Sequence, residues 1–420
     1  MKEETPNPNL IETAETHNKS YAKYLKIILP VLFILAAALG IYQWQFGTET
    51  NQTNPIDTLY KGVSDGSLED YYNFGQSQKG TDTTEVNFYA VGDIMLSRNV
   101  AGQISKNQKD SYWPFRNLET ELRSTDFNFG NLESPFSGRD DFNATGSLVF
   151  NAPTWTMPGL VQHNFKVLNL ANNHAYDQGK DALLYTKNLL KENGLLGLGV
   201  GNNLDEAFEG QVYSVKGMRI GFIGASYASE NDGGVVKNDQ VARIEDVERF
   251  KKSIADLKTR SDFVVVTMHA GTEYTREPNQ SQIDFAHAAI DAGADLIIGA
   301  HPHWIQTTEQ YKGKYIFYSL GNFVFDQMWS QETKQGLMLK ISVSKNGSCA
   351  PNPSVSPSGQ QQVSCSDSLQ GNPIATSLKQ IELVPVIIEN YGQPRIANET
   401  EKQNILKKIG VITAIITPIN

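Results

Sequence analysis

The stretch Leu296-Ile297-Ile298-Gly299-Ala300-His301-Pro302-His303 sets the pattern that organises this chain of 420 residues. An apolar run of strand length ends in a glycine, and two histidines follow it, two residues apart. In extended chain this spacing keeps both imidazoles on one face, which is how the end of a strand presents metal ligands. Taken alone, the stretch fits equally well a buried strand followed by a loop that happens to contain two histidines.

The same pattern recurs at four other places, where an apolar, strand-like run ends in residues suited to metal or proton chemistry. These residues are Asp93, Glu133, Asn173 with His174, and His269. Carboxylates, neutral imidazoles and an amide oxygen together suit divalent ions such as Mn, Fe, Zn or Mg. Two such ions sharing one carboxylate would activate a bound water. His174 would then serve as a general acid, because the preceding Asn173 takes the ligand role.

Each of these residues also has a purely structural explanation. Asp93 could cap a following helix, and Glu133 could be an exposed turn residue. Asn172 and Asn173 are ordinary turn formers. A single histidine at a strand end, such as His269, is more often a hydrogen-bonded structural residue than a ligand. The prediction of a metal site therefore depends on the repetition of the pattern and not on any one residue.

The order of strand and helix signals predicts the fold class. From Val86 onward, apolar runs such as 263–268 and 296–300 alternate with amphipathic segments such as 247–257 and 283–292. Such alternation predicts an α/β domain with a largely buried sheet. In that architecture ligands bind outside the carboxyl ends of the strands, and the candidate metal ligands occupy those positions.

A membrane anchor is predicted near the amino terminus. Residues 27–42 contain no charged side chain, and the run from Tyr24 to Trp44 has close to the roughly 20 residues that a membrane span needs. Lys19, Lys23 and Lys26 lie shortly before the uncharged run, whereas the next basic residue after it is Lys61. The positive-inside rule therefore predicts a single-pass protein of the cell membrane, with its amino terminus in the cytoplasm and its C-terminal domain outside.

The segments around this anchor complete the domain prediction. Residues 1–23 form a cytoplasmic tail, residues 45–84 form a polar stalk rich in Asn, Gln, Thr and Ser, and residues 85–420 form the α/β domain. A cleaved signal peptide is the competing interpretation, with a cleavage site near Ala36-Ala37-Ala38. It would have an unusually long n-region and a cleavage site inside the apolar run. A buried helix is disfavoured because the segment has no polar face.

Charge and cysteine usage exclude some kinds of function. The net charge of -10 disfavours a nucleic-acid surface, so an anionic ligand would need a local basic patch or a metal ion. Cys349 and Cys365 lie in a loop insertion, residues 345–373, that is rich in Ser, Pro, Asn and Gln. Their spacing is too wide for a zinc-binding pair. If the loop lies outside the cytoplasm, a disulfide between them is the favoured outcome.

Six motifs along the chain are recognisable together. They are Ala90-Val91-Gly92-Asp93-Ile94-Met95, Asn131-Leu132-Glu133-Ser134-Pro135, Asn172-Asn173-His174 with Asp177 and Gly179, Met268-His269-Ala270-Gly271 with Glu273-Tyr274, Gly299-Ala300-His301-Pro302-His303, and Ser319-Leu320-Gly321-Asn322-Phe323. In this order they resemble the motifs of the CapA family of bacterial poly-γ-glutamate capsule proteins, and the likeness runs from about residue 85 to residue 395. Any single motif would be weak, but six in order are specific.

The resemblance implies a fold and a set of ligands. The fold is a four-layered α/β/β/α sandwich of metallophosphatase type, preceded here by one transmembrane helix, with one or two divalent metal ions at the strand ends. The implied ligands are Asp93 and His303 for the first metal, Glu133 as a bridge, and Asn173, His269 and His301 for the second metal. His174, oriented by Asp177, takes the place of the catalytic proton donor.

The chain departs from the metallophosphatase pattern at two positions. Met95 stands where such enzymes have a histidine ligand, and Glu133 stands where they have a shorter aspartate. A thioether is a poor ligand for these ions, so the first metal is one ligand short and phosphoesterase activity does not follow from the resemblance. Glu273 is a candidate to supply the missing ligand, with Tyr274 and Asn322 as further accessory residues.

Three functions are compatible with the sequence. The first is a membrane-anchored, extracytoplasmic component of capsule polymer synthesis or export, of poly-γ-glutamate type. Its partners would be the anionic polymer and other membrane proteins of synthesis and export, and a bound cation would hold polymer carboxylates that the acidic chain otherwise repels. The second is a metal-dependent hydrolase of a phosphoester or a γ-glutamyl amide. The third is a catalytically silent polymer-binding module.

Overall fold

The structure is a computed structural model. It describes residues 83–143, 146–227, 239–346, 375–411 and 413–418, together with the backbone of two short strands within 351–363. The chain divides into two compact units, Met1–Gly80 and Thr81–Asn420, and every described residue belongs to the second unit. The account that follows concerns this second unit alone.

The predicted N-terminal segments lie outside the described residues. This holds for the tail, the membrane anchor at 24–44 and nearly all of the stalk, and also for Cys349 and Cys365. In the part of the chain that the structure describes, no helix is both long enough and apolar enough to cross a membrane. The first strand begins at Thr83, just inside the predicted stalk.

The larger sheet has nine strands among the described residues. They are β1 (Thr83–Ile94), β2 (Phe127–Leu132), β3 (Phe165–Asn169), β4 (Leu196–Leu198), β11 (Asn322–Val324), β12 (Gln335–Asn346), β15 (Thr376–Glu389), β16 (Gln393–Ile396) and β17 (Ile415–Ile416). Their order is β16-β15-β12-β1-β2-β3-β4, with β11 beside β1 and β17 beside β15. Because β1 to β4 run parallel, their carboxyl ends meet at one edge of the sheet.

The smaller sheet has six strands among the described residues. They are β5 (Gln211–Val215), β6 (Met218–Ser226), β7 (Phe263–His269), β8 (Leu296–Ala300), β9 (Thr308–Tyr311) and β10 (Lys314–Phe317), in the order β5-β6-β7-β8-β10-β9. Strands β6, β7, β8 and β10 are parallel. A separate pair, β13 (Pro351–Val355) and β14 (Gln361–Val363), lies within the predicted loop insertion between β12 and β15.

The two large sheets pack face to face through an aromatic core. Phe88, Phe127 and Phe129 come from the nine-stranded sheet and pack against Phe222 and Val265 of the six-stranded sheet. The rings of Phe129 and Phe222 stack with centroids 5.8 Å apart, and Phe88 and Phe127 stack at 4.7 Å. These side chains are almost completely buried, so this layer supplies much of the apolar area that stabilises the fold.

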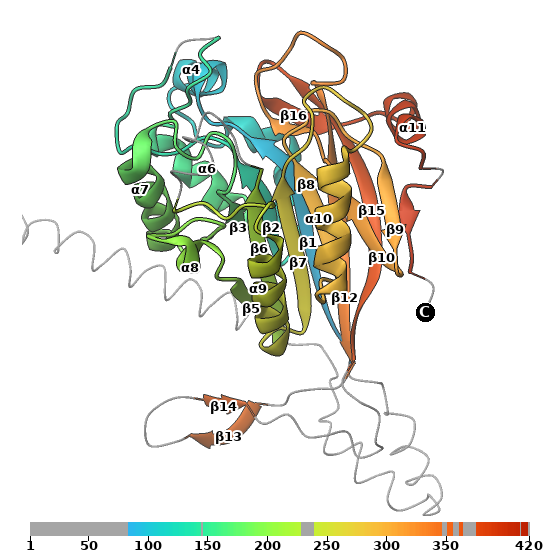
Figure 1. The fold of residues 1–420 in the computed structure, drawn as a ribbon. Helices are drawn as coiled ribbons and strands as arrows, with labels where there is room; N and C mark the ends of the chain where they lie inside the picture. The colour runs from blue at the N-terminus through green and yellow to red at the C-terminus, as the bar shows by residue number, and fades with distance from the viewer. Residues whose placement is uncertain are drawn as a thin grey trace, which may run out of the picture. The chain divides into compact units, whose positions relative to one another are not determined.

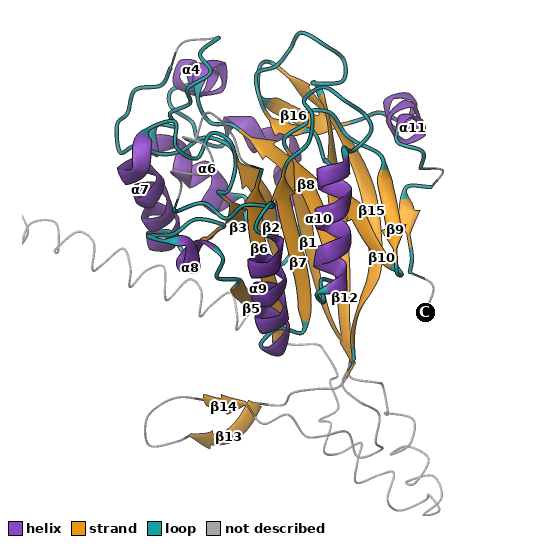
Figure 2. Ribbon diagram, in the orientation of Figure 1, coloured by secondary structure: helices purple, strands orange, loops and turns teal. Residues whose placement is uncertain are grey.

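Helices cover the outer face of each sheet (Figure 1 and Figure 2). The helices α4 (Arg98–Lys106), α5 (Glu119–Arg123), α6 (Met157–Gln162) and α7 (Gly179–Glu192), with the 3-10 turns η1 (Trp113–Leu118) and η2 (Thr154–Thr156), pack on the nine-stranded sheet. The helices α8 (Leu204–Ala207), α9 (Val247–Thr259) and α10 (Gln280–Asp291) pack on the six-stranded sheet. The layers therefore run helix, sheet, sheet, helix, and the predicted α/β class is confirmed.

Local sequence explains where two of the helices begin. Asn279 caps α10 by accepting a hydrogen bond from the backbone of Gln282, whose side chain reaches back to the cap. Asn398 and Glu401 form the same reciprocal arrangement at the start of α11 (Glu399–Lys408), which packs on the edge of the inter-sheet core. Such capping boxes satisfy backbone donors that the first turn leaves free.

A close backbone contact positions the end of β1. A Cβ atom at Gly92 would lie 1.8 Å from the carbonyl oxygen of Gly321, so only glycine fits there. The contact allows the backbone N–H of Asp93 to donate to that same oxygen over 3.1 Å and places Asp93 beside Asn322 in the register of β1 and β11. The glycine thus brings two site residues together.

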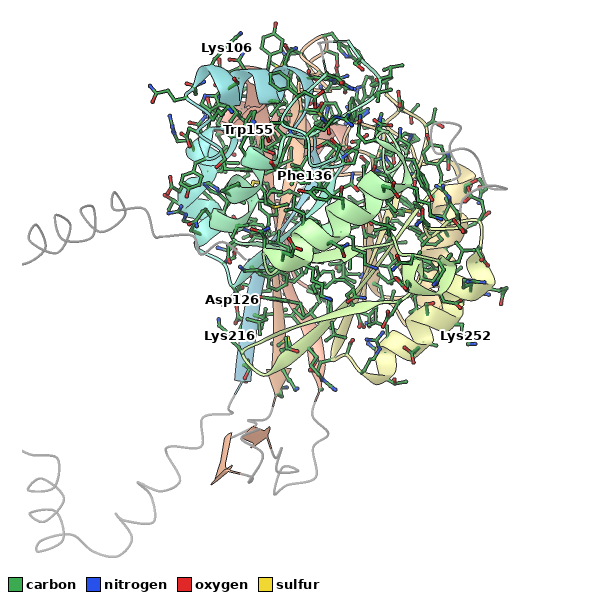
Figure 3. All side chains as sticks on the ribbon, turned by 90° about the vertical axis from the view of Figure 1, so that its left-hand side faces the viewer. Lys106, Asp126, Phe136, Trp155, Lys216 and Lys252 are labelled. Atoms are coloured by element: carbon green, nitrogen blue, oxygen red, sulfur yellow. The ribbon has the colours of Figure 1, made fainter. Side chains whose placement is uncertain are left out.

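Ion pairs join the two sheets near the amino ends of their parallel strands. Asp126, directly before β2, pairs with Lys216 in the β5–β6 turn, with 2.7 Å between Nζ and Oδ1; Figure 3 labels both residues. Lys345 of β12 lies 3.1 Å from Asp262, which precedes β7. The Lys216–Asp126 pair has an exposed lysine and contributes at most about 1 kcal/mol. The Lys345–Asp262 pair is largely buried, and desolvation offsets much of its attraction. Both pairs therefore align the sheets and do not replace the aromatic core.

Gly92→Ala is expected to lower the free energy of unfolding by about 1–3 kcal/mol or more, because the new methyl group overlaps a backbone oxygen that cannot rotate away. The matched control is Gly102→Ala in α4, where a Cβ would meet its nearest neighbour, Phe142, at 3.7 Å. There the change is expected to be neutral or stabilising by up to about 1 kcal/mol. Urea denaturation of the full chain measures both, and equal effects at the two positions would contradict the steric argument.

Candidate metal centre

The predicted strand-end residues converge between the two sheets. Asp93 lies at the end of β1 and Glu133 directly after β2, both in the nine-stranded sheet. His269 ends β7, while His301 and His303 follow β8, both in the six-stranded sheet. All five side chains are at least 95% buried. The site is therefore assembled from the carboxyl ends of strands in both sheets, as strand-end ligands of an α/β fold are expected to be.

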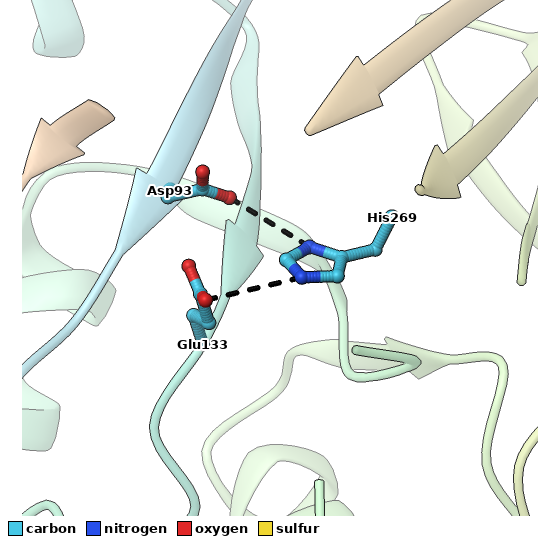
Figure 4. A group of neighbouring side chains, drawn as sticks. All are labelled: Asp93, Glu133 and His269. Carbon is cyan, nitrogen blue, oxygen red and sulfur yellow. Dashed lines mark ion pairs between the residues drawn. The ribbon is translucent and has the colours of Figure 1, made fainter. Parts of the chain in front are cut away.

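Three of these residues form the tightest group of donors (Figure 4). One oxygen or nitrogen atom from each of Asp93, Glu133 and His269 lies within 4.8 Å of the others. Asp93 Oδ1 is 3.8 Å from His269 Nδ1, and Glu133 Oε1 is 3.8 Å from His269 Nε2. Two carboxylates and an imidazole are thus directed toward one small volume.

A second set of donors surrounds His269 Nε2. Asn173 Oδ1 lies 2.8 Å from this nitrogen, and His301 Nδ1 lies 3.2 Å from it, in addition to Glu133 Oε1 at 3.8 Å. Ligand atoms held at about 2.0–2.2 Å from one Zn²⁺-sized ion lie about 3.0–3.5 Å from each other. The three distances scatter around that spacing, from 2.8 Å to 3.8 Å, so small shifts of these side chains would bring them around a single divalent ion.

The other side of the site is less complete. His303 Nδ1 lies 3.6 Å from Asp93 Oδ2 and 2.9 Å from Asn322 Oδ1. Met95 belongs to the apolar core, and its sulfur accepts a hydrogen bond from the backbone N–H of Ser97 at 3.1 Å. Met95 is thus a packing residue in this structure, which leaves the predicted first metal position with fewer candidate side chains than the predicted second position.

Glu273 and Tyr274 lie at the edge of this side. The Glu273 side chain is exposed, whereas the Tyr274 ring stacks on His303 with centroids 5.8 Å apart. Burial and the nearby Glu273 charge raise the pKa of Tyr274 to about 12, so its hydroxyl stays protonated near neutral pH. Tyr274 therefore covers His303, and Glu273 contributes negative charge from the surface.

Glu133 carries the strongest evidence that the site holds a cation. It is fully buried, and among the described residues neither of its carboxylate oxygens has a hydrogen-bond partner. Burial raises the pKa of Glu133 well above its ordinary value of 4.5, and the charge of Asp93 raises it further. An ionised carboxylate in such a place is costly unless a positive charge lies beside it. The donor set of carboxylates, imidazoles and an amide fits a divalent ion.

The buried histidines are in the form that ligands need. Burial lowers the pKa of His269 well below 6.5, and the neighbouring His301 and His303 lower it further. Burial also lowers the pKa of His301 well below 6.5, followed by the effect of His303. Neutral imidazoles have a lone pair available for a metal ion, whereas imidazolium ions do not.

His174 lies beside the ligand cluster and is held by Asp177. Its Nδ1 lies 2.8 Å from Asp177 Oδ2, and its Nε2 lies 3.7 Å from Glu133 Oε1. The same Asp177 oxygen accepts a hydrogen bond from the backbone of Phe150 at 2.5 Å, and the Phe150 ring stacks on the imidazole at 3.9 Å. One carboxylate thus orients both the imidazole and the ring that covers it.

Several supporting residues were not identified from the sequence. Arg98 lies over the rings of Phe150 and Phe325, 4.7 Å and 5.7 Å from their centroids, and forms a buried ion pair with Asp326. Phe325 in turn packs against His303 at 4.9 Å. No spacing in the sequence connects these residues.

Asn131 was also missed as a site residue. It lies two residues before Glu133, and side chains two apart on a strand point to the same face. This alternation could have identified Asn131 from the sequence.

Four of the eleven non-glycine residues with positive φ among the described residues lie at the site. Arg98, Tyr274, His301 and His303 have positive φ angles of 47°, 61°, 101° and 57°. Residues other than glycine rarely adopt this conformation, and when they do it is concentrated at functional sites. The strain is consistent with side chains that are held where the surrounding packing requires them.

A family model and two similar sequences agree with the resemblance. A family model described as "Bacterial capsule synthesis protein PGA_cap" matches residues 87–327. The chain is 32% identical to "PGA biosynthesis protein CapA" of Bacillus subtilis (strain 168) over 82% of this chain and 83% of that protein. It is 33% identical to "Capsule biosynthesis protein CapA" of Bacillus anthracis over 64% of this chain and 66% of that protein. A putative 5'-nucleotidase structure from Staphylococcus aureus aligns over 78% of this chain and 58% of that chain, with 16% identity and a TM-score of 0.40.

Glu133→Gln is expected to change how stability depends on pH when divalent ions are removed with EDTA. In the unfolded chain Glu133 loses its proton near 4.5, whereas in the folded chain its raised pKa retains the proton to higher pH. The free energy of unfolding of the wild type should therefore fall as pH rises above about 4.5 through the raised pKa. Glutamine cannot ionise, so the variant should lose less stability over this range.

Urea denaturation at a series of pH values measures this difference. His269 and His301 have lowered pKa values, so they destabilise the folded chain as pH falls below about 6.5. Because His269 lies 3.8 Å from the replaced carboxylate, the two profiles are compared above pH 6.5, where both imidazoles are neutral in both proteins. Identical pH profiles for the two proteins would show that Glu133 is not the buried ionisable group inferred here.

Proposed function

Because the chain belongs to the bacterial capsule synthesis protein family PGA_cap, we propose that it is a metal-binding, membrane-anchored component of the synthesis or export of an anionic capsule polymer, of poly-γ-glutamate type. The two Bacillus relatives are named for PGA biosynthesis and capsule biosynthesis. The anchor at 24–44 and the extracytoplasmic position of the domain are supported by the uncharged run and by the lysines that precede it.

One observation carries the metal part of the proposal. Glu133 is a fully buried carboxylate with unpartnered oxygens, and it faces the imidazoles of His269 and His174 at 3.8 Å and 3.7 Å. A structural role would provide hydrogen-bond donors to such a group. A ligand role explains why no hydrogen-bond donor among the described residues contacts the Glu133 oxygens. A carboxylate that binds a cation uses its oxygens to coordinate the ion.

The metallophosphatase type of the fold is part of the same proposal. Two facing sheets with outer helices, and ligands at the carboxyl ends of strands from both sheets, are the arrangement that the family resemblance implies. The donor types support one well-formed position, built from Asn173, His269, His301 and Glu133. The second position, near Asp93 and His303, has Met95 in the place of a ligand and is proposed to bind an ion more weakly.

The bound ion would connect the site to an anionic polymer. The chain has a net charge of -10, so a polyanion is repelled by the protein as a whole. A divalent cation supplies a local positive charge to which carboxylate oxygens bind readily. The residues of the chain would hold the ion at the carboxyl ends of the strands. The rings of Phe150, Tyr274 and Phe325 would exclude water from it.

A second candidate function is favoured by one specific observation. The 2.8 Å contact between His174 and Asp177 fixes an imidazole beside Glu133, and a purely polymer-binding site has no need of an oriented imidazole. Such a pair suits a metal-dependent hydrolase in which His174 delivers a proton to a leaving group. The bond cleaved would be a phosphoester or the γ-glutamyl amide of the polymer.

The capsule proposal is tested in the native host. Deletion of the gene is expected to lower the amount of surface polymer, measured as glutamate released by acid hydrolysis of polymer that has been extracted from the cell surface and freed of protein. Wild type and His287→Ala, a variant outside the site, should restore the polymer, whereas His269→Ala should not, because it removes an imidazole from the ligand set. Normal polymer after deletion would contradict the capsule role, and full restoration by His269→Ala would show that the metal centre is dispensable.

The hydrolase candidate is tested with the purified full chain in detergent. If it is correct, Mn²⁺-loaded wild type cleaves a phosphomonoester or a γ-glutamyl amide. His174→Asn should then lose at least about 100-fold in kcat with little change in Mn²⁺ affinity, since His174 is not in the ligand set. Asp177→Asn should have a smaller effect, because it only disturbs the orientation of the imidazole. Equal activity of wild type and His174→Asn would rule out this mechanism.

A further inference from the structure

Asn131 contacts two of the proposed ligands at once. It lies on β2 and is 99% buried. Its Nδ2 donates to Asp93 Oδ1 over 2.8 Å and lies 3.1 Å from His269 Nδ1. Asp93 is the last residue but one of β1 in the nine-stranded sheet, whereas His269 is the last residue of β7 in the six-stranded sheet. A single carboxamide therefore connects ligands that the two sheets deliver separately.

The Asn131 side chain is itself held in place by a second asparagine. Asn169 Nδ2 donates to Asn131 Oδ1 over 2.8 Å and to the carbonyl oxygen of Ala171 over 2.8 Å. Because the oxygen of Asn131 accepts from Asn169, its nitrogen must face Asp93. A Cβ at Gly224 would lie 2.2 Å from Asn169 Oδ1, so the fit around Asn169 is close.

The register of the strands explains why these side chains meet. Asp93 is paired with Asn131 across β1 and β2, and Asn131 is paired with Asn169 across β2 and β3. Directly paired residues on neighbouring strands have their side chains on the same face, within about 5 Å of each other. The three residues thus form one row across the end of the nine-stranded sheet, and His269 lies against the middle of that row.

We propose that Asn131, braced by Asn169, is a positioning residue of the metal centre. By holding Asp93 Oδ1 it leaves Oδ2 directed toward His303, 3.6 Å away. Its Nδ2 also packs against the Nδ1 edge of the His269 ring at 3.1 Å, and Nε2 of that ring is directed toward Asn173 and His301. The amide thereby fixes the separation of ligands from different sheets. This inference depends on the proposed metal centre. It adds Asn131 as a supporting residue that does not itself bind the ion.

The contrast with Glu133 shows why the amide matters. Glu133 has no hydrogen-bond partner among the described residues, so no hydrogen bond fixes the position of its carboxylate. The geometry of the cluster therefore depends on the ligands that are held by other residues. Without Asn131, Asp93 Oδ1 would lose its amide donor and the ring of His269 would lose the contact that sets its rotation. Removing an outer partner of a metal ligand typically lowers metal affinity about 10- to 100-fold.

A purely structural asparagine on the same strand offers the matched control. Asn128 of β2 is also fully buried, but its Nδ2 donates to the carbonyl oxygens of Leu122 and His163, 2.7 Å away in each case. Its Oδ1 accepts from the backbone of Tyr89 at 3.2 Å. Asn128 contacts no proposed ligand in these interactions, so replacing it tests the effect of losing a buried amide from β2 alone.

The experiment compares Mn²⁺ binding by the full chain in detergent after removal of ions with EDTA. Titration calorimetry gives the affinity, and the EPR spectrum of bound Mn²⁺ reports its surroundings. Asn131→Leu is expected to bind Mn²⁺ about 10- to 100-fold more weakly than wild type and to change the spectrum. Asn128→Leu should bind within about threefold of wild type with an unchanged spectrum. Asn169→Ala, which removes only the brace, should give an intermediate loss.

The outcomes separate this inference from the proposal it depends on. A wild type that binds no Mn²⁺ overturns the metal centre itself. A wild type that binds while Asn131→Leu binds equally well overturns the positioning role alone, as would equal losses in Asn131→Leu and Asn128→Leu. If Asn131→Leu does not fold, Asn169→Ala decides, because an unchanged affinity in that variant would show that the row of asparagines does not support the ligands.

Discussion

The face-to-face packing of two sheets is the constraint on which the rest of this structure depends. Ligands from β1 and β2 must meet ligands from β7 and β8, so the site exists only at the separation that the inter-sheet core allows. That separation is set by large aromatic side chains such as Phe129 and Phe222, which stack at 5.8 Å. Close-packed interiors resist changes of even a methylene group, so the core holds the two halves of the site in a fixed relation.

Electrostatics then explains why these residues are unusual for a protein interior. Glu133, Asp93 and three histidines are buried together at the edge of the sandwich, where burial raises the pKa of Glu133 and lowers the pKa of His269 and His301. A folded chain gains nothing from such a cluster by itself, because desolvated charges and unpartnered oxygens are destabilising. A divalent ion would offset that cost, and this is the physical reason for assigning the cluster to a ligand role.

Residues that contact the candidate ligands from outside give the cluster its geometry. Asn131 and Asn169 support it from the nine-stranded sheet, Asp177 orients His174, and the Arg98–Asp326 pair holds the rings of Phe150 and Phe325 over the imidazoles. Such partners determine ligand orientation almost as strongly as the ligands themselves. The packing of Met95 into the core leaves fewer candidate ligands near Asp93 and His303 than near His269, so the two proposed metal positions are not equivalent.

The sequence by itself determined the α/β class, the strand-end placement of the candidate ligands and the family, because hydrophobic periodicity and ordered motifs are local properties of the chain. It also indicated that Met95 breaks the ligand pattern. Only the tertiary structure decided which donors face one another, that Asn131 lies between Asp93 and His269, and that Arg98 and Phe150 support the imidazoles. These contacts join residues far apart in the chain, and their geometry is fixed by sheet register and core packing, which no local pattern contains.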